Sequence, residues 1–247
     1  KMRPFVDKIM VIDDLANRLL YCDILLDQTF ERKEIAYLPL VRSETILLCG
    51  SKYALLREQF SKNRAAAIDK RAKFNGIKQI LINFGGVDLA NKSGQVLSLL
   101  SKIELTPGPR VEIVLGKKPL YLDKIKRQAE DYKLNVKILS YVENMSALIL
   151  KADIAIGAGG STSWERCTLG LPALIFVDAD NQLLIAQNLE KAGAVNVIDR
   201  VDNKIIKTLL ELNANINKYS SLSRAAFRIC DGLGVNRVIN EITGLSF

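Results

Sequence analysis

The 247-residue sequence is 49% hydrophobic and 25% charged, with a formal net charge of +8, and this balance is typical of a globular protein. Its apolar runs fall well short of the roughly 20 residues that cross a bilayer, and no signal-peptide pattern opens it, so we expect a cytoplasmic protein without a membrane span. Because histidine is absent, imidazole base catalysis, Ser–His triads and His-ligated metal sites are excluded for this chain alone.

Cysteine and charge patterns exclude further classes. The four cysteines (Cys22, Cys49, Cys167 and Cys230) have no paired spacing, so we expect them to be reduced and partly buried rather than to form disulfides or a zinc site. Lys and Arg are interspersed with Asp and Glu and lack an aromatic stripe, which favours a solvated basic surface over nucleic-acid binding. We expect neither a metal nor a cofactor.

The first part of the chain predicts three short buried strands and one helix. The strands are expected at 8–12, 22–27 and 45–50, and the helix at 51–64. So few elements bury too little surface for a stable domain, so we interpret residues 1–67 as the C-terminal part of an N-terminal Rossmann-like domain that begins upstream. The charged stretch 65–76 lacks apolar periodicity and is predicted to be the domain boundary.

From residue 74 to 247 apolar strands alternate with helices. Strands are expected at 78–86, 110–116, 135–142, 153–160, 172–177 and 195–198, and helices at 93–103, 119–132, 144–152, 163–170 and 180–193. From about residue 202 two or three helices follow, with a break at DGLG (231–234). This alternation predicts an α/β class with a parallel sheet covered on both faces, in a second Rossmann-like domain.

Two glycine-rich turns follow strands of this predicted sheet. One is NFGGVDLANKSG (83–94), with Gly85 and Gly86; the other is GAGGSTS (157–163), where hydroxyl residues follow the glycines. Parallel sheets bind ligands beyond the carboxyl ends of their strands, where helix N-termini attract anions. Neither turn matches a Walker A loop or the dinucleotide fingerprint, and steric relief at a strand end is the alternative. Two such turns in one sheet favour an anion site.

Residues beside the second turn leave alternatives open. Asp178 follows Gly157 by the spacing of a ribose-binding acid, which would suit NAD, but an NAD fingerprint normally opens its domain. Glu165 fits a capping box with Thr162, or could accept hydrogen bonds from a ribose. Trp164 could pack in the core or form the wall of a nucleotide site.

Further polar residues lie at other strand ends. Asn181, Gln182 and Asn188 could cap a helix or bind sugar hydroxyls, because amides both donate and accept hydrogen bonds. Asp13 and Asp14 could act as acid or base. Adjacent residues on an extended chain point in opposite directions, so solvated or interdomain carboxylates are favoured.

An ordered set of segments resembles a known family. The segments are IDDLANR, CDILLDQ, YLPLV, YALLREQF, INFGGVD, GAGGSTSWE, LGLPALIFV, DNQ and DGLGVNR. Together they resemble the UDP-2,4-diacetamido-2,4,6-trideoxy-β-L-altropyranose hydrolase family of pseudaminic acid biosynthesis, across essentially the whole chain. The resemblance implies a GT-B fold of two Rossmann-like domains, the first incomplete here, similar to the lipid II N-acetylglucosaminyl transferase.

The resemblance also implies the residues of a UDP-sugar site. UDP-binding residues would be Gly85, Gly86, Gly159, Gly160, Ser161, Thr162 and Glu165, with Glu165 on the ribose. Asn181 and Gln182 would bind the sugar or the phosphates. The activity implied is hydrolysis of the UDP-sugar to free sugar and UDP.

The sequence departs from this family in the catalytic residue. The resemblance implies that a His in an upstream glycine-rich turn activates water, and this chain has no histidine. We therefore expect an N-terminally shortened form, inactive alone, with a degenerate homologue as the alternative. A GT-B glycosyltransferase of surface polysaccharide synthesis, a non-catalytic UDP-sugar-binding protein and an NAD-binding protein are the other hypotheses.

Overall fold

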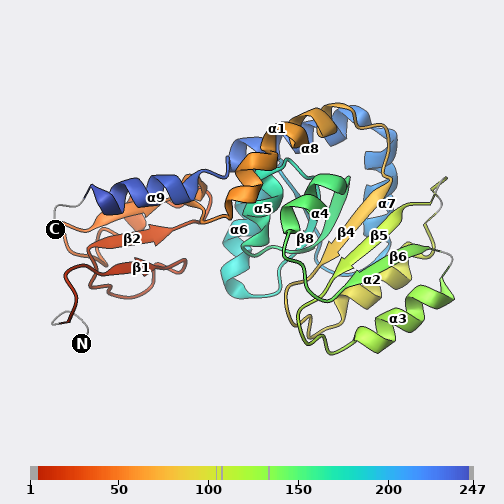
Figure 1. Ribbon diagram of the computed structural model, residues 1–247, viewed down its shortest axis with the longest axis horizontal. Helices are drawn as coiled ribbons and strands as arrows, with labels where there is room; N and C mark the ends of the chain where they lie inside the picture. The colour runs from red at the N-terminus through yellow and green to blue at the C-terminus, as the bar shows by residue number, and fades with distance from the viewer. Residues whose placement is uncertain (1–4, 104, 107, 133, 245–247) are drawn as a thin grey trace.

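The computed structural model describes residues 5–103, 105–106, 108–132 and 134–244, and it contains two parallel β-sheets (Figure 1). The three-stranded sheet has the order β1 (Met10–Ile12), β2 (Ile24–Asp27) and β3 (Ile46–Cys49). The six-stranded sheet has the order β6-β5-β4-β7-β8-β9. Every strand pair within these sheets is parallel, which confirms the α/β class.

The six-stranded sheet has helices on both faces (Figure 1). Its strands are β4 (Gln79–Asn83), β5 (Arg110–Val114), β6 (Asn135–Leu139), β7 (Ile154–Ala158), β8 (Ala173–Phe176) and β9 (Asn196–Val197). The helices of the chain are α1 (Glu58–Ala72), α2 (Lys92–Leu100), α3 (Leu122–Asp131), α4 (Met145–Lys151), α5 (Thr162–Thr168), α6 (Asp180–Lys191), α7 (Asn203–Ala214), α8 (Ile216–Ile229) and α9 (Gly234–Thr243). These positions confirm the predicted alternation and the break before the last helix.

Alternation along each strand builds two apolar layers. In β4, Ile80 and Ile82 pack with α2, α3 and α7, whereas Leu81 packs with α1, α4 and α5 on the other face. Successive strand side chains point to opposite faces, so a strand covered on both sides is apolar throughout. Ala173–Phe176 shows this, because all four of its residues are buried.

Helix α1 covers most of the stretch that was predicted to be the domain boundary. Residues 51–53 form a short 3-10 helix, and α1 then runs unbroken through most of the stretch 65–76. Ala67 is fully buried, and Arg71 donates to the carbonyls of Ile149, Ala152 and Leu169. The predicted domain boundary thus falls on a continuous helix, and α1 docks on the second half largely through arginine-to-carbonyl hydrogen bonds, which leave no apolar periodicity.

Helix α9 returns to the three-stranded sheet (Figure 1). Its Val238 and Ile242 pack with Ile24, Leu26 and Leu48. The division into 1–67 and 74–247 stays a prediction, but two helices pack across it: α1 with the second half and α9 with the first. All four cysteines are buried. Within the described ranges, no helix has the length and apolar character of a membrane span.

Candidate functional site

The crevice between β4 and β7 is the point where the chain changes direction in the six-stranded sheet. From β4 the strand order runs outward to β6, and from β7 it runs outward the other way to β9. In open parallel sheets such a switch point places two strand-to-helix turns on either side of a ligand crevice. Here those turns are the predicted glycine-rich turns after β4 and β7.

A cavity of about 370 Å³ lies beside the turn after β7. From the second half it is lined by Gly160, Ser161, Trp164, Asn181, Gln182 and Ile185. From the first half it is lined by Ile12, Asp13, Asp14, Gln28 and Thr29. The structure therefore brings together four of the predicted site residues: Gly160, Ser161, Asn181 and Gln182.

The turn after β7 presents unoccupied backbone amides. The Gly159 N–H donates to the Phe176 carbonyl at 2.9 Å, which ties the turn to β8. Among the described residues, nothing accepts a hydrogen bond from the N–H groups of Gly160 and Ser161, and the Ser161 side chain does not cap α5. Free amides at a strand-to-helix turn give a local positive potential that suits an anion.

The turn after β4 differs because a carboxylate already occupies it. Asp88 accepts hydrogen bonds from the N–H groups of Lys92 and Ser93, at 2.8 and 2.9 Å, and so neutralises the start of α2. Gly85 and Gly86 are exposed and together line a small hollow that is separate from the cavity. Gly86 also lines a second hollow, together with Asp178. The structure does not bring these two glycines into the 370 Å³ cavity.

Asp178, the candidate ribose acid for NAD, also lies outside this cavity. Its carboxylate forms an ion pair with Lys92. Its backbone N–H donates to the side-chain oxygen of Gln182 at 3.1 Å. That hydrogen bond fixes the Gln182 amide and leaves its NH₂ group toward Gly160.

Glu165 is not a capping residue. Ser161 is the N-cap of α5 and Thr162 is already helical, so the capping-box interpretation is wrong. Thr162 lines a small void with Asn83 and Arg166 rather than the cavity. Burial raises the pKa of Glu165, and the charges of Arg57 and Arg166 only partly oppose this. Within the described residues, nothing donates a hydrogen bond to this carboxylate.

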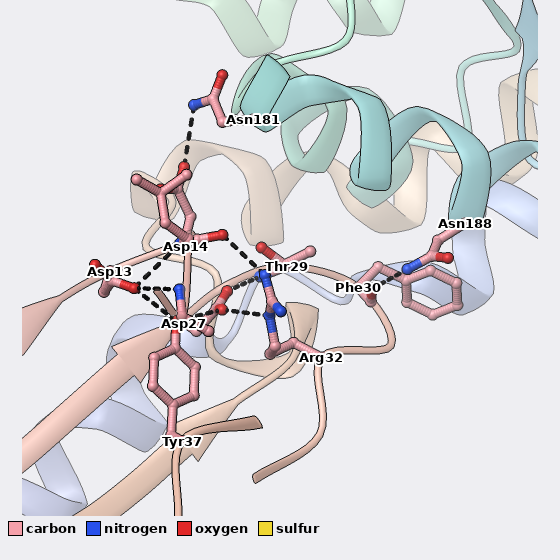
Figure 2. Close-up of polar contacts among 11 residues, drawn as sticks. Asp13, Asp14, Asp27, Thr29, Phe30, Arg32, Tyr37, Asn181 and Asn188 are labelled. Carbon is pink, nitrogen blue, oxygen red and sulfur yellow. Dashed lines mark hydrogen bonds and ion pairs between the residues drawn. The ribbon is translucent and has the colours of Figure 1, made fainter. Parts of the chain in front are cut away.

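Asp13 is held rigidly in the first-half wall of the cavity (Figure 2). Its carboxylate accepts from the N–H groups of Leu15 and Ala16 and from the Tyr37 hydroxyl, and it pairs with Arg18 at 2.7 Å. Burial would raise the pKa of Asp13, but these hydrogen bonds and the Arg18 charge together lower it. A carboxylate stabilised in its charged form is a poor general base.

The Tyr37 hydroxyl lies between two carboxylates (Figure 2). It is 2.9 Å from Asp13 and 2.8 Å from Asp27, which is fully buried. Burial raises the pKa of Tyr37 far above its usual value, and the two carboxylates add to this rise. Arg32 pairs with Asp27 at 2.7 Å and also donates to the Asp14 carbonyl, so the network fixes the loop that carries Asp14.

Asp14 and α6 join the two halves (Figure 2). The Asn181 amide donates to the Asp14 carboxylate at 3.2 Å, at the exposed rim of the cavity. Two turns further along α6, the Asn188 amide donates to the Phe30 carbonyl at 2.9 Å. Asp14 therefore contacts the second half through Asn181, and Asn188 binds the first half instead of lining the cavity.

Four cavity residues were not predicted from the sequence: Ile12, Gln28 and Thr29 in the first half and Ile185 in α6. Ile12 ends β1, and Gln28 and Thr29 directly follow β2. Carboxyl ends of neighbouring parallel strands meet at one edge of a sheet, so this position in the pattern is the signal that could have found these three first-half residues. Trp164 is 3% exposed; it packs in the core and also lines the cavity, and its role as a nucleotide wall stays a prediction.

Sequence comparison finds bacterial relatives of greater length. The chain is 25% identical over 202 residues to the spore coat polysaccharide biosynthesis protein SpsG of Bacillus subtilis, covering 80% of this chain and 58% of SpsG. It is 31% identical over 142 residues to the UDP-N-acetylglucosamine–N-acetylmuramyl-(pentapeptide) pyrophosphoryl-undecaprenol N-acetylglucosamine transferase of Lactobacillus acidophilus, covering 55% and 38%. The chain thus spans less than two thirds of these curated relatives.

Structural comparison and the family match agree on the fold. Acinetobacter baumannii MurG superposes with a TM-score of 0.65 at 15% identity, covering 99% of this chain and 70% of MurG. The glycosyltransferase WaaG has a TM-score of 0.57 at 16% identity, and the match covers 90% of this chain and 63% of WaaG. The architecture is therefore that of GT-B glycosyltransferases. Residues 45–233 match the glycosyltransferase family 28 C-terminal domain, and the protein belongs to that family.

Proposed function

We propose that this protein binds a UDP-sugar in the 370 Å³ cavity and acts as a GT-B glycosyltransferase of surface polysaccharide synthesis. The observation that carries the proposal is the pair of unoccupied amides at Gly160 and Ser161, facing a rim of amide and carboxylate side chains. Concave sites of this size, with a few convergent polar groups, are typical of small-molecule ligands.

The lining matches the chemistry of a nucleotide sugar. The amides of Gly160 and Ser161, with Gly159 and Thr162 shaping the turn, would hold the pyrophosphate. Neutral amides and hydroxyls suit sugar hydroxyls, and Asn181, Gln182, Gln28 and Thr29 supply them. The family resemblance adds Glu165 as ribose ligand and Gly85 and Gly86 as a second UDP contact to the proposal; these residues lie outside the lining of the 370 Å³ cavity, so the nucleotide would extend beyond it.

The functions named for similar proteins support sugar transfer. SpsG is named for spore coat polysaccharide biosynthesis, and the Lactobacillus acidophilus relative is a transferase that uses UDP-N-acetylglucosamine. Staphylococcus aureus MnaA, a structural neighbour with a TM-score of 0.60 at 16% identity over 90% of this chain and 60% of MnaA, is described in complex with UDP. By analogy, we propose that this protein is a cytoplasmic enzyme that transfers the sugar of a UDP-sugar.

The reaction would proceed by departure of UDP from the anomeric carbon. The amides of the turn after β7 would stabilise the charge that develops on the leaving phosphate. Asp13 does not suit the role of base, because its hydrogen bonds and lowered pKa favour the charged carboxylate. The base stays unassigned in this chain.

Calorimetric titration with UDP and with NAD tests the ligand. We expect UDP to bind in the range of about 1 µM to 1 mM that is usual for enzyme substrates, and NAD not to bind. A Gly160→Ala variant changes the proposed site without unfolding the protein. The added Cβ would lie 3.7 Å from the Gln182 amide nitrogen, an ordinary contact that the fold tolerates, so a change in UDP affinity would report on the site. Absence of UDP binding at millimolar concentration would overturn the proposal.

Hydrolysis of a UDP-diacetamido-trideoxy sugar, as in pseudaminic acid biosynthesis, is the second candidate. It is favoured by the segments IDDLANR and CDILLDQ, which carry that resemblance and contribute Asp13, Asp14 and Gln28 to the cavity. The two reactions differ in whether water or an acceptor hydroxyl reaches the anomeric carbon. Release of UDP by the full-length protein without an acceptor would support hydrolysis. Binding with neither reaction would support a non-catalytic UDP-sugar-binding role.

A further inference from the structure

Arg166 is a buried cation with an incomplete set of partners. It lies in α5 and is 4% exposed. One terminal nitrogen, Nη2, donates to the Ala158 carbonyl at 2.7 Å and to the Ser163 hydroxyl at 3.0 Å. The buried Nε has no hydrogen-bond partner. In the described part of the chain, no carboxylate lies within ion-pair distance of this guanidinium.

A buried charge without a counterion is costly, so its retention calls for a physical reason. Burial lowers the pKa of Arg166 to about 10, with Cys167 and Glu165 opposing the change. The guanidinium therefore stays charged at neutral pH. Strongly perturbed charged groups beside a cleft are candidates for a functional role.

The position of the guanidinium is defined by the end of β7. Ala158 is the last residue of that strand and directly precedes the turn at Gly159, Gly160 and Ser161. A Cβ at Gly157 would lie 3.4 Å from Nη1, so the guanidinium packs against the backbone of the same strand end. The positive charge thus lies behind the turn, and Gly160 and Ser161 face the cavity in front.

We propose that Arg166 is a positioning residue for a phosphate group bound at this turn. Its hydrogen bond to the Ala158 carbonyl holds the turn in place, and its charge attracts the bound phosphate through the turn without contacting it. This inference rests on the proposed binding of a UDP-sugar. In this proposal the bound phosphate is the counterion of Arg166. The substrate thus supplies the negative charge that the described chain does not place beside this guanidinium.

Arg71 is the matched comparison. It is also 4% exposed and lies in a helix, but its three guanidinium nitrogens all donate to backbone carbonyls. It lies near Asp153, at the amino edge of the six-stranded sheet, far from the turn after β7 along the strands. Loss of Arg71 therefore reports the structural cost of removing a buried arginine.

The experiment compares ligands with and without phosphates. UDP, UMP and uridine are titrated calorimetrically into the wild-type protein and into the Arg166→Gln, Arg166→Lys and Arg71→Gln variants. Glutamine removes the charge and leaves a neutral polar side chain of shorter reach than the guanidinium, and lysine keeps the charge. We expect Arg166→Gln to weaken UDP binding about tenfold and uridine binding less than about twofold, with UMP between.

The controls separate charge from structure. Arg166→Lys should keep the UDP-to-uridine affinity ratio within about threefold of the wild type, and Arg71→Gln should lower the Tm without changing that ratio. Equal losses for UDP and uridine in Arg166→Gln, or unchanged UDP affinity, would overturn this inference alone. A wild-type protein that does not bind UDP overturns the proposed function and this inference with it. If Arg166→Gln does not fold, Arg166→Lys still provides a test. A tenfold fall of its UDP-to-uridine affinity ratio, relative to the wild type, would overturn the role of the charge.

Discussion

The two walls of the cavity are stabilised by different forces. The six-stranded sheet is held by apolar layers on both faces, in which Ile80, Ile82 and Leu174 are fully buried. The loops of the three-stranded sheet are held by the hydrogen-bonded network of Asp13, Asp27, Arg32 and Tyr37. Apolar packing is insensitive to pH, whereas a carboxylate whose pKa is lowered in the fold, such as Asp13, stabilises the fold while it is charged.

Surface exposure shows the same contrast. Near the three-stranded sheet, Leu19, Tyr21 and Ile35 are 64%, 75% and 72% exposed. The polar network thus positions Asp14, Gln28 and Thr29 where apolar burial is sparse. One wall of the cavity is an apolar frame, and the other is held by a hydrogen-bonded network in which the pKa of Asp13 is lowered.

The largest expected effect is on the apolar frame. Leu174→Ala should lower the free energy of unfolding by about 3–5 kcal/mol, because a fully buried strand residue leaves a cavity that the two layers cannot fill. Leu25→Ala, in the small cluster of the three-stranded sheet, should cost only about 2–3 kcal/mol, because its surroundings can collapse. Urea unfolding measures both, and the reverse order would contradict the comparison.

Tyr37→Phe tests the polar wall. Loss of the hydroxyl leaves the facing carboxylates of Asp13 and Asp27 without their shared donor, so we expect a loss of about 1–3 kcal/mol in unfolding free energy. Tyr21→Phe is the control and should be neutral, since Tyr21 is 75% exposed. Equal stabilities of the two variants would show that the network does not support the fold.

Glu165→Ala should separate stability from binding. Its carboxylate receives no hydrogen bond in the described structure, so removal should change the unfolding free energy by less than about 1 kcal/mol. As the proposed ribose ligand, it should weaken UDP binding about tenfold, which is about 1.4 kcal/mol. Calorimetry and thermal unfolding on one sample decide this; a large loss of stability with unchanged affinity would contradict the ribose role.

The smallest expected effect is on the pH dependence of the unfolding free energy, where Asp13 and Glu165 should act in opposite directions. The pKa of Asp13 is lowered from 3.8 in the fold, so its stabilisation is present above that value and is lost as pH falls through the folded pKa. The pKa of Glu165 is raised from 4.5, so its contribution is present below that value and is lost as pH rises through the folded pKa. Unfolding of Asp13→Asn and Glu165→Gln from pH 3 to pH 7 should show opposite slope changes relative to the wild type, and changes of the same sign would contradict the assignment.

Short-range patterns made the six-stranded sheet predictable. Runs such as 172–177 are apolar because both faces of β8 are covered, and the glycines after β7 mark its end. The docking of α1 and α9 could not be predicted in this way. Arg71 reaches three carbonyls that are distant in sequence, and Val238 packs on a sheet about two hundred residues earlier in the chain, so neither leaves a local periodicity.

The candidate site was predictable where it follows strand ends. Gly160, Ser161, Asn181 and Gln182 lie at the carboxyl edge of the sheet, as expected for parallel strands. The two glycine turns look alike in sequence, but Asp88 folds back onto the start of α2, and nothing similar happens at α5. Side-chain rotation of this kind, and the burial of Arg166, depend on tertiary packing that spacing does not encode.

Helix α6 contacts the first half at two positions along its length, Asn181 and Asn188. Asn188 binds a backbone carbonyl in the partly buried interior of the contact, and Asn181 binds an exposed carboxylate at the rim. They are two turns apart, or roughly 10 Å along the helix axis. Breaking the Asn181 contact alone would open the rim of the cavity, while the Asn188 contact still ties the far end of α6 to the first half.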